Sequence, residues 1–135
     1  MWLLVSLSGT VKAQPATGTK LFSLLPGTAT GINFRNDIVE TSNMFMYMYE
    51  NLYTGGGVAI GDINLDGLPD IYFSSTLGSN KLYQNLGNLQ FRDITETAGV
   101  NGGAGIKTGV SMVDINNDGL LDIFVNKSGF KDPAL

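Results

Sequence analysis

The chain carries two copies of one segment, spaced 52 residues apart. Residues 57–73 align without a gap on residues 109–125, and both copies contain a D-x-N-x-D-G-x-x-D loop between apolar residues. A match of this length does not arise by coincidence. Internal repetition at a period of about 20–50 residues is typical of folds assembled from repeated supersecondary units. The chain is therefore expected to fold as consecutive copies of one unit.

The first copy and the residues after it predict four short strands. Apolar, β-branched and aromatic residues flank the acidic loop, and two later segments alternate polar and apolar residues. A hairpin turn is expected at 86–88, one helical turn at 95–99 and a flexible connection at 101–105. The predicted strands are 58–60, 71–74, 81–85 and 89–94. Four antiparallel strands per repeat can form a β-propeller blade, so we expect an all-β fold of β-propeller-type blades, one complete and one partial.

The chain divides into four segments around these copies. We expect a truncated signal peptide at 1–13, an N-terminal leader with one buried strand at 14–56, the first repeat at 57–105 and an incomplete second repeat at 106–135. The apolar run Trp2–Leu7, with the small residues Val11 and Ala13 before a cleavage position at Gln14, indicates the signal peptide. A buried N-terminal strand is the alternative for this run. No later stretch is a transmembrane candidate.

Within the leader, Met44–Tyr49 alternates methionine with aromatic residues. This alternation favours a strand that is buried on both faces. The alternative is a methionine-rich, adaptable binding surface, because methionine side chains are flexible and polarisable.

Oxygen-bearing residues stand at alternate positions of both acidic loops. Calcium takes six to eight oxygen ligands, and a loop of this kind turns them inward while the chain wraps around the ion. Gly67 and Gly119 at position 6 allow a sharp turn with positive φ. Without a cation, three carboxylates around one point would repel one another, which disfavours a metal-free acidic turn. Two Ca²⁺ ions are expected, with the ligands Asp62, Asn64, Asp66, the Leu68 carbonyl and Asp70 in the first loop, and Asp114, Asn116, Asp118, the Leu120 carbonyl and Asp122 in the second.

Two other interpretations of the loops are weaker. Magnesium demands a tighter octahedral cage and retains its waters. An EF-hand begins with the same D-x-N-x-D-G but needs a bidentate Glu at position 12 and flanking helices. Position 12 is Phe73 in the first loop and Val125 in the second, and both flanks are β-rich.

Composition excludes several classes of function. The chain has no Cys and no His, which removes Ser-His-Asp and Cys-His catalysis, thiolate redox chemistry and the usual zinc sites. A net charge of −4 with only eight basic residues disfavours nucleic-acid binding. The acidic residues outside the loops form no spaced catalytic motif; they are Asp37, Glu40, Glu50, Asp93, Glu96 and Asp132.

Residues 58–70 resemble the FG-GAP, or VCBS-type, repeat of integrin α-chain propellers and of many exported bacterial proteins. The motifs at 80–85 and 91–100 are further similar to bacterial proteins that join these repeats to an ASPIC/UnbV domain, relatives of cartilage acidic protein. The resemblance covers roughly residues 21–125. It implies a propeller of about seven blades, with calcium held between the first two strands of a blade, and an exported protein. The remaining blades are expected in sequence downstream of residue 135.

These features together favour an exported, non-enzymatic, calcium-binding scaffold for ligand binding or adhesion at the cell surface. Calcium would be structural, and the partner would be an unknown protein or carbohydrate. The alternative is part of a carbohydrate-active enzyme, a lyase or hydrolase whose catalytic residues lie outside this chain. A third hypothesis is a free-standing two-repeat module that is stable only as an oligomer, because its strand edges would be unpaired.

Overall fold

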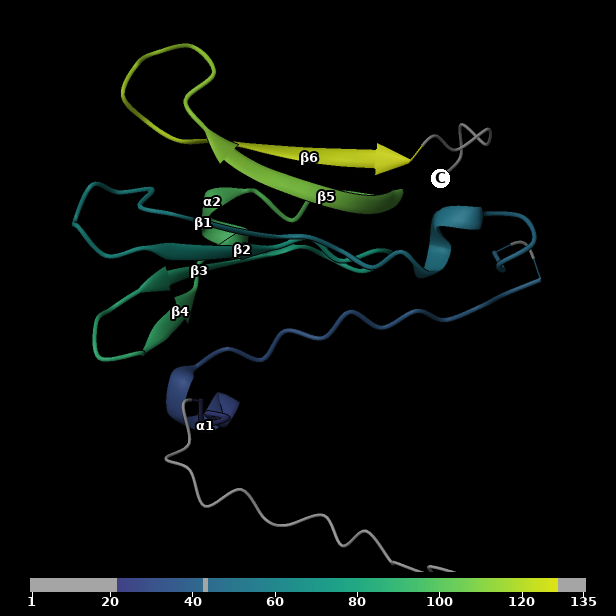
Figure 1. Cartoon of the computed structure of the whole chain (residues 1–135), viewed down its shortest axis with the longest axis horizontal. Coiled ribbons are helices and arrows are strands. Elements are labelled where there is room, and N and C mark those ends of the chain that lie inside the picture. The colour runs from purple at the N-terminus through teal and green to yellow at the C-terminus, as the bar shows by residue number, and fades with distance from the viewer. Residues whose placement is uncertain (1–21, 43, 129–135) are drawn as a thin grey trace, which may run out of the picture.

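A four-stranded antiparallel sheet organises the first repeat in the computed structural model, which describes residues 22–42 and 44–128. The spatial order of the strands follows their order along the chain, as Figure 1 shows. The strands are β1 (Val58–Gly61), β2 (Asp70–Phe73), β3 (Lys81–Asn85) and β4 (Phe91–Asp93). The expected four-stranded unit is confirmed, and each strand begins and ends within about two residues of its predicted bounds, as is usual for strand ends.

The fourth strand is shorter than its alternating pattern predicted. Leu89 was expected to begin this strand, but its φ of 59° places it in the hairpin turn, beside Asn88 with φ 52° and Gly87 with φ 82°. The Leu86 N–H donates to the Gln90 carbonyl and closes this turn. Three consecutive left-handed residues cannot continue a strand, so pairing with β3 starts only at Phe91.

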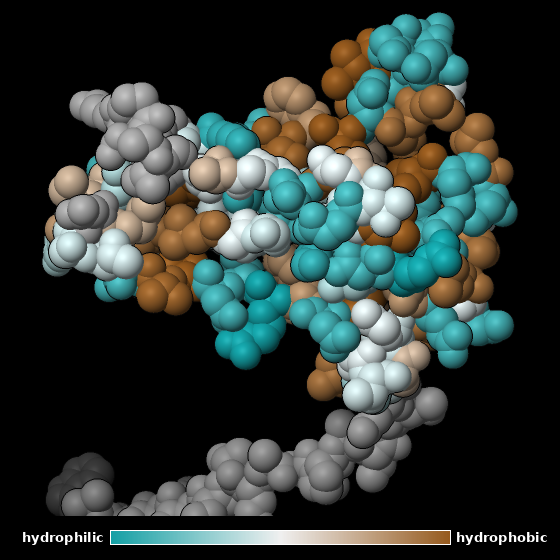
Figure 2. Space-filling model, turned by 180° about the vertical axis from the view of Figure 1, so that it is seen from behind, coloured by the Kyte–Doolittle hydropathy of each residue, from teal (hydrophilic) through white to brown (hydrophobic). Residues whose placement is uncertain are grey.

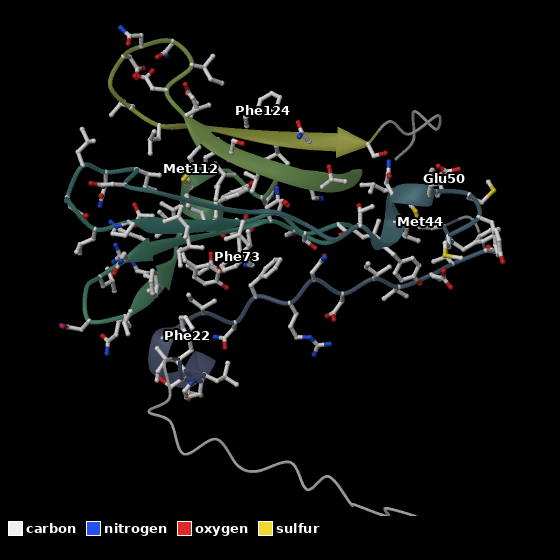
Figure 3. The ribbon with its side chains drawn as sticks, viewed as in Figure 1. Phe22, Met44, Glu50, Phe73, Met112 and Phe124 are labelled. Carbon is white, nitrogen blue, oxygen red and sulfur yellow. The ribbon has the colours of Figure 1, made fainter. Side chains whose placement is uncertain are left out.

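The second repeat forms a two-stranded antiparallel sheet from β5 (Ile106–Val113) and β6 (Asp122–Ser128). The sheet lies against β1 (Figure 1). A Cβ on Gly61 would lie 2.6 Å from Leu121 Cδ1 and 3.0 Å from Met112 Sδ, so the two sheets approach closely at this glycine. Figure 3 shows Met112 between the two sheets and Phe124 on the outer side, where it is 54% exposed.

Two tyrosine side chains of the first sheet are buried, one on each face. Tyr72 and Tyr83 are almost fully buried. The Tyr72 hydroxyl donates to the Val100 carbonyl at 2.7 Å and accepts from Asn80 Nδ2 at 2.7 Å. Asn80 is itself inaccessible to solvent, and its Oδ1 accepts the Ser75 N–H. This chain of hydrogen bonds satisfies polar groups that would otherwise be costly to bury.

An extended segment of the leader, residues 31–38, runs along the first sheet (Figure 1). Its alternate residues are half-buried. The Phe34 ring stacks on Phe73 with centroids 4.8 Å apart, and Figure 3 shows Phe73 on the side of the sheet that faces this segment. Asn36 accepts the Thr76 N–H at 2.8 Å. The sequence analysis did not predict this packing.

The predicted buried strand at Met44–Tyr49 is wrong. Met44 forms only an isolated bridge with Thr41, and the next residues form a turn closed by the Met48 N–H donating to the Phe45 carbonyl. Tyr47 is 87% exposed. Alternation with period two was misleading here because no neighbouring strand in the described residues pairs with this segment.

The helices of the described residues are single turns: α1 (Gly27–Thr30), the 3-10 helix η1 (Glu50–Tyr53) and α2 (Thr95–Ala98). α2 is the helical turn expected after the fourth strand, and Gly99 ends it in the left-handed region with φ 68°. None of these helices is long and apolar enough to cross a membrane. The predicted signal peptide at 1–13 lies outside the described residues.

Candidate metal centre

The two acidic loops join the first and second strands of their repeats, β1 to β2 and β5 to β6. Both project from the same end of the two sheets (Figure 1). Gly67 and Gly119 have φ values of 84° and 86°, as predicted for position 6. Position 4 is also left-handed in both loops, with φ of 60° at Leu65 and at Asn117. Asparagine often adopts this conformation, whereas leucine rarely does.

Hydrogen bonds within the first loop hold its residues at positions 1, 3 and 5 close together. Asp62 accepts the N–H groups of Asp66 at 3.1 Å and Gly67 at 2.8 Å. Asp66 accepts the Leu68 N–H at 2.8 Å and the Asn64 side-chain amide at 2.8 Å. The loop is therefore wrapped around its own acidic side chains, which satisfy the N–H groups of a tight turn.

The second loop repeats this pattern bond for bond. Asp114 accepts the Asp118 and Gly119 N–H groups at 3.1 and 2.8 Å. Asp118 accepts the Leu120 N–H at 2.8 Å and the Asn116 side-chain amide at 2.9 Å. The shared sequence motif thus produces the same local structure in two places.

The ninth position differs between the loops. Asp70 is fully buried, and its two oxygens accept the Ile63 N–H at 3.0 Å and the Asn85 N–H at 2.7 Å. Asp122 is only half-buried, and among the described residues the hydrogen bond recorded for it comes from the Ile115 N–H at 3.0 Å. Asn85 is a residue that sequence reasoning missed, because a lone asparagine at a strand end carries no motif.

The loop hydrogen bonds keep carboxylates ionised. Desolvation acts to raise the pKa of Asp62, but four backbone N–H groups, led by that of Gly67, outweigh it and lower this pKa below its ordinary 3.8. The Leu120 N–H and the Asn116 side chain lower the pKa of Asp118 in the same way. Negative charge is thus held at the tips of both loops at neutral pH.

The structure brings the predicted ligands into one loop each, but it does not converge their charges on one point. Within residues 22–42 and 44–128, no three acidic side chains are grouped as a metal site. The carboxylates instead accept N–H groups of their own loop. The donor set still consists of carboxylate, amide and carbonyl oxygens, the hard ligands that calcium prefers. In the chemistry of their oxygens the residues fit calcium, and binding would require the three carboxylates of a loop to come closer together.

Two of the acidic residues outside the loops form ion pairs with basic residues. Asp37 is in an exposed ion pair with Arg35 at 2.7 Å. Asp93 is paired with Lys81 at 2.8 Å and also accepts from Thr95. Asp132 lies outside the described residues.

Comparison with known proteins agrees with the loop motif. The family model of the FG-GAP-like repeat matches residues 62–125. Cartilage acidic protein 1 of Xenopus tropicalis is 37% identical over 95 residues, which cover 70% of this chain and 15% of that protein. The human and mouse proteins of the same name are each 39% identical over 72 residues, 53% of this chain and 11% of their own length. The chain therefore spans only a small part of these relatives, and the similarity to the FG-GAP-like repeat lies in residues 62–125.

Proposed function

We propose that this chain is part of an exported, non-catalytic scaffold whose repeats are stabilised by calcium and which binds a ligand or mediates adhesion outside the cell. The duplicated loop carries this proposal. Two nine-residue loops of one motif have the same pattern of hydrogen bonds and the same left-handed positions. Such duplication is better explained by a metal ion that both loops bind than by two unrelated acidic turns.

Calcium would be held in each loop by the acidic and amide side chains at positions 1, 3, 5 and 9 and by the carbonyl at position 7. When bound, the ion would supply two positive charges, which offset most of the negative charge of three neighbouring carboxylates. The loop residues themselves would connect the ion to the two strands. Because Asp62 follows β1 and Asp70 begins β2, a loop that is fixed at both positions links the two strands at their open end. Calcium would therefore have a structural role, because it would hold the two strands together.

The proposed binding role is supported by apolar side chains at the loop end of the repeats. Leu65 and Leu89 are 67% and 62% exposed, and both are left-handed. Figure 2 shows apolar surface among the polar residues at this end. A bulky apolar residue that is exposed in an unfavourable conformation gains nothing for the isolated fold and suggests contact with a partner. An unknown protein or carbohydrate is the expected class of partner.

The proposed location rests on the predicted signal peptide and on the relatives. The names of the vertebrate relatives refer to cartilage. The resemblance to bacterial proteins with an ASPIC/UnbV domain suggests an exported bacterial protein. We further propose that the repeats belong to a larger propeller, since the chain covers so little of the relatives that it matches.

Thermal unfolding with and without calcium tests the proposed function. A ligand that binds only the folded state stabilises it by about 2.7 kcal/mol at 100 times its Kd, so the melting temperature is expected to rise by several degrees in millimolar calcium. Asp66→Asn together with Asp118→Asn should abolish this rise. Asp37→Asn, which alters an exposed residue outside the loops, is the matched control. An unchanged melting temperature of the intact chain in calcium would contradict the proposal.

A further inference from the structure

We propose that Asn101 is a site of spontaneous covalent modification: its side chain cyclises onto the backbone nitrogen of Gly102, loses ammonia and is hydrolysed to aspartate or isoaspartate. The co-reactant is water and no metal takes part, so this proposal is independent of the calcium binding proposed above. Asn101 lies in the connection from α2 to β5, between the two repeats (Figure 1). The modification therefore alters the junction of the repeats and leaves both acidic loops unchanged.

The residue after Asn101 leaves the attacking nitrogen unobstructed. Of the asparagines in the sequence, only Asn101 is followed by glycine. Gly102 has no Cβ to crowd the nitrogen, and its φ of 81° is a conformation that favours glycine. Within residues 22–42 and 44–128, the structure records no hydrogen bond from the Gly102 N–H. This nitrogen can therefore attack without first breaking a hydrogen bond to the protein.

The Asn101 side chain is held over this nitrogen by a local turn. Its Oδ1 accepts the Gly103 N–H at 3.2 Å, two residues further along the chain. Negative charge develops on Oδ1 when the nitrogen attacks the side-chain carbonyl carbon, and an N–H group that is already directed at this oxygen stabilises the charge. The Asn101 carbonyl accepts the Asn80 N–H at 2.9 Å, which fixes the main chain of the same residue.

Two ammonium groups lie on the residues that follow. Lys107 is inaccessible to solvent, and its Nζ donates to the Gly103 carbonyl at 2.9 Å. Lys127 Nζ donates to the Ala104 carbonyl at 3.1 Å. The ion pairs recorded among the described residues include neither lysine. Positive charge beside the loop favours the anions that form during the attack, and it also favours the carboxylate of the product.

The chemistry balances with water alone. A bond forms between the Gly102 nitrogen and Asn101 Cγ, the proton of that nitrogen passes to the side-chain amine, and the bond from Cγ to the amine breaks to release ammonia. The product is a five-membered succinimide. Water then opens the ring at one of its two carbonyl carbons, which gives either aspartate or isoaspartate. Asparagine is among the residues that limit the chemical durability of proteins, and this reaction is the reason.

Isoaspartate disturbs the junction because it adds one carbon atom to the main chain between residues 101 and 102. Gly102 is packed so closely on Asn80 that a Cβ at Gly102 would overlap Asn80 Nδ2. Asn80 is fully buried, and Nδ2 donates to the Tyr72 hydroxyl at 2.7 Å, so this side chain cannot move aside without loss of a buried hydrogen bond. Aspartate adds no atom to the main chain and leaves this packing intact.

Peptide mapping of the 135-residue chain by mass spectrometry tests the site. The folded chain is incubated at neutral pH, digested, and the replacement of NH₂ by OH is measured at each asparagine. Asn88 is the control within the same molecule, because it is exposed in a turn but is followed by Leu89. Asn101 should convert more than about tenfold faster than Asn88, a difference of about 1.4 kcal/mol in activation free energy. Equal conversion at the two residues, or none at Asn101, would overturn the proposal.

Two glutamine variants separate cyclisation from simple hydrolysis of an amide. Asn101→Gln retains the amide but needs a larger ring, so residue 101 should stay unmodified through the same incubation. Asn88→Gln is the matched control, and conversion at Asn101 should continue in it at the unaltered rate. Isoaspartate and aspartate peptides are distinguished by chromatography against synthetic standards. Conversion that yields aspartate alone would contradict the succinimide route.

Thermal unfolding of the incubated chain tests the effect on the junction. The isoaspartate form should melt about 3–6 °C below the fresh chain, as expected for the loss of one buried contact in a domain of this size. Asn101→Gln should keep its melting temperature through the incubation, and Asn101→Asp should differ little from the fresh chain. An isoaspartate form that melts with the fresh chain would overturn the effect on the junction. The mass measurement on the unaltered chain needs no variant, so a variant that does not fold leaves it decisive.

Discussion

Phe34 stacks on Phe73 with ring centroids 4.8 Å apart and an interplanar angle of 15°. Phe73 in turn meets the edge of the Tyr83 ring, at 5.9 Å and 80°. A leader residue thus completes an aromatic cluster on the first sheet. Offset stacked and edge-to-face pairs contribute about 0.5–1.5 kcal/mol beyond the burial of their area.

Phe34→Ala should therefore lower the free energy of unfolding by about 2–3 kcal/mol, through lost burial and lost stacking. Chemical denaturation in urea measures this change. Phe22→Ala is the control, because Phe22 is 91% exposed and its removal should change stability by less than about 0.5 kcal/mol. Equal effects of the two substitutions would contradict the packing of the leader on the sheet.

Tyr72→Phe should destabilise the chain by about 1–3 kcal/mol. The substitution removes the hydroxyl that links Asn80 to the Val100 carbonyl and leaves the buried Asn80 amide without this acceptor. Thermal or urea unfolding measures the loss. Tyr47→Phe, at a position that is 87% exposed, serves as the matched hydroxyl deletion and should have almost no effect.

Stability should fall in acid partly because of Asp93. Desolvation acts to raise the pKa of this carboxyl, but hydrogen bonds from Lys81 and Thr95 outweigh it and lower the pKa below the ordinary 3.8. A carboxyl with a lowered folded-state pKa contributes stability above its unfolded pKa, and this contribution is lost as pH falls through the folded pKa. The loss should accordingly begin near pH 4 and increase below it.

Asp93→Asn should flatten this part of the acid profile, because the residue can no longer titrate. The measurement is the free energy of unfolding as a function of pH between neutrality and pH 2. The ion pair of Asp93 with Lys81 is partly exposed, so we expect Asp93 to contribute less than about 1 kcal/mol to the free energy of unfolding. An acid profile identical to that of the unaltered chain would show that Asp93 makes no such contribution.

Leu65→Asn should stabilise the calcium-free chain by about 0.5–1 kcal/mol. Leu65 and Asn117 occupy the same loop position with the same φ of 60°, and asparagine tolerates that conformation better than leucine. The reverse change, Asn117→Leu, should destabilise by a similar amount. Thermal unfolding of both variants in a chelator checks the pair, and changes of the same sign in the two would contradict the explanation.

Local patterns in the sequence were sufficient to predict the first sheet and the backbone of the loops. β1 and β3 follow from short-range hydrophobic patterns, and the positive φ of Gly67 follows from the turn that the motif requires. Such features depend on neighbours along the chain, so the motif has the same effect in both repeats.

Features that depend on tertiary contacts could not be predicted. The turn at Met44–Tyr49 has the alternation of a strand but no strand beside it in the described residues. The stacking of Phe34 and the contact between Asn85 and Asp70 join residues that are 39 and 15 positions apart. Nothing in a single sequence identifies such partners before the strands are placed in space.

Isothermal titration calorimetry of the intact chain with calcium tests the central claim most directly. We expect two calcium ions to bind per chain, one in each loop, and Asp118→Asn to leave one. Asp37→Asn should retain both. A titration that shows no calcium binding, or a stoichiometry that the Asp118 substitution leaves unchanged, would contradict the claim that these loops are calcium sites.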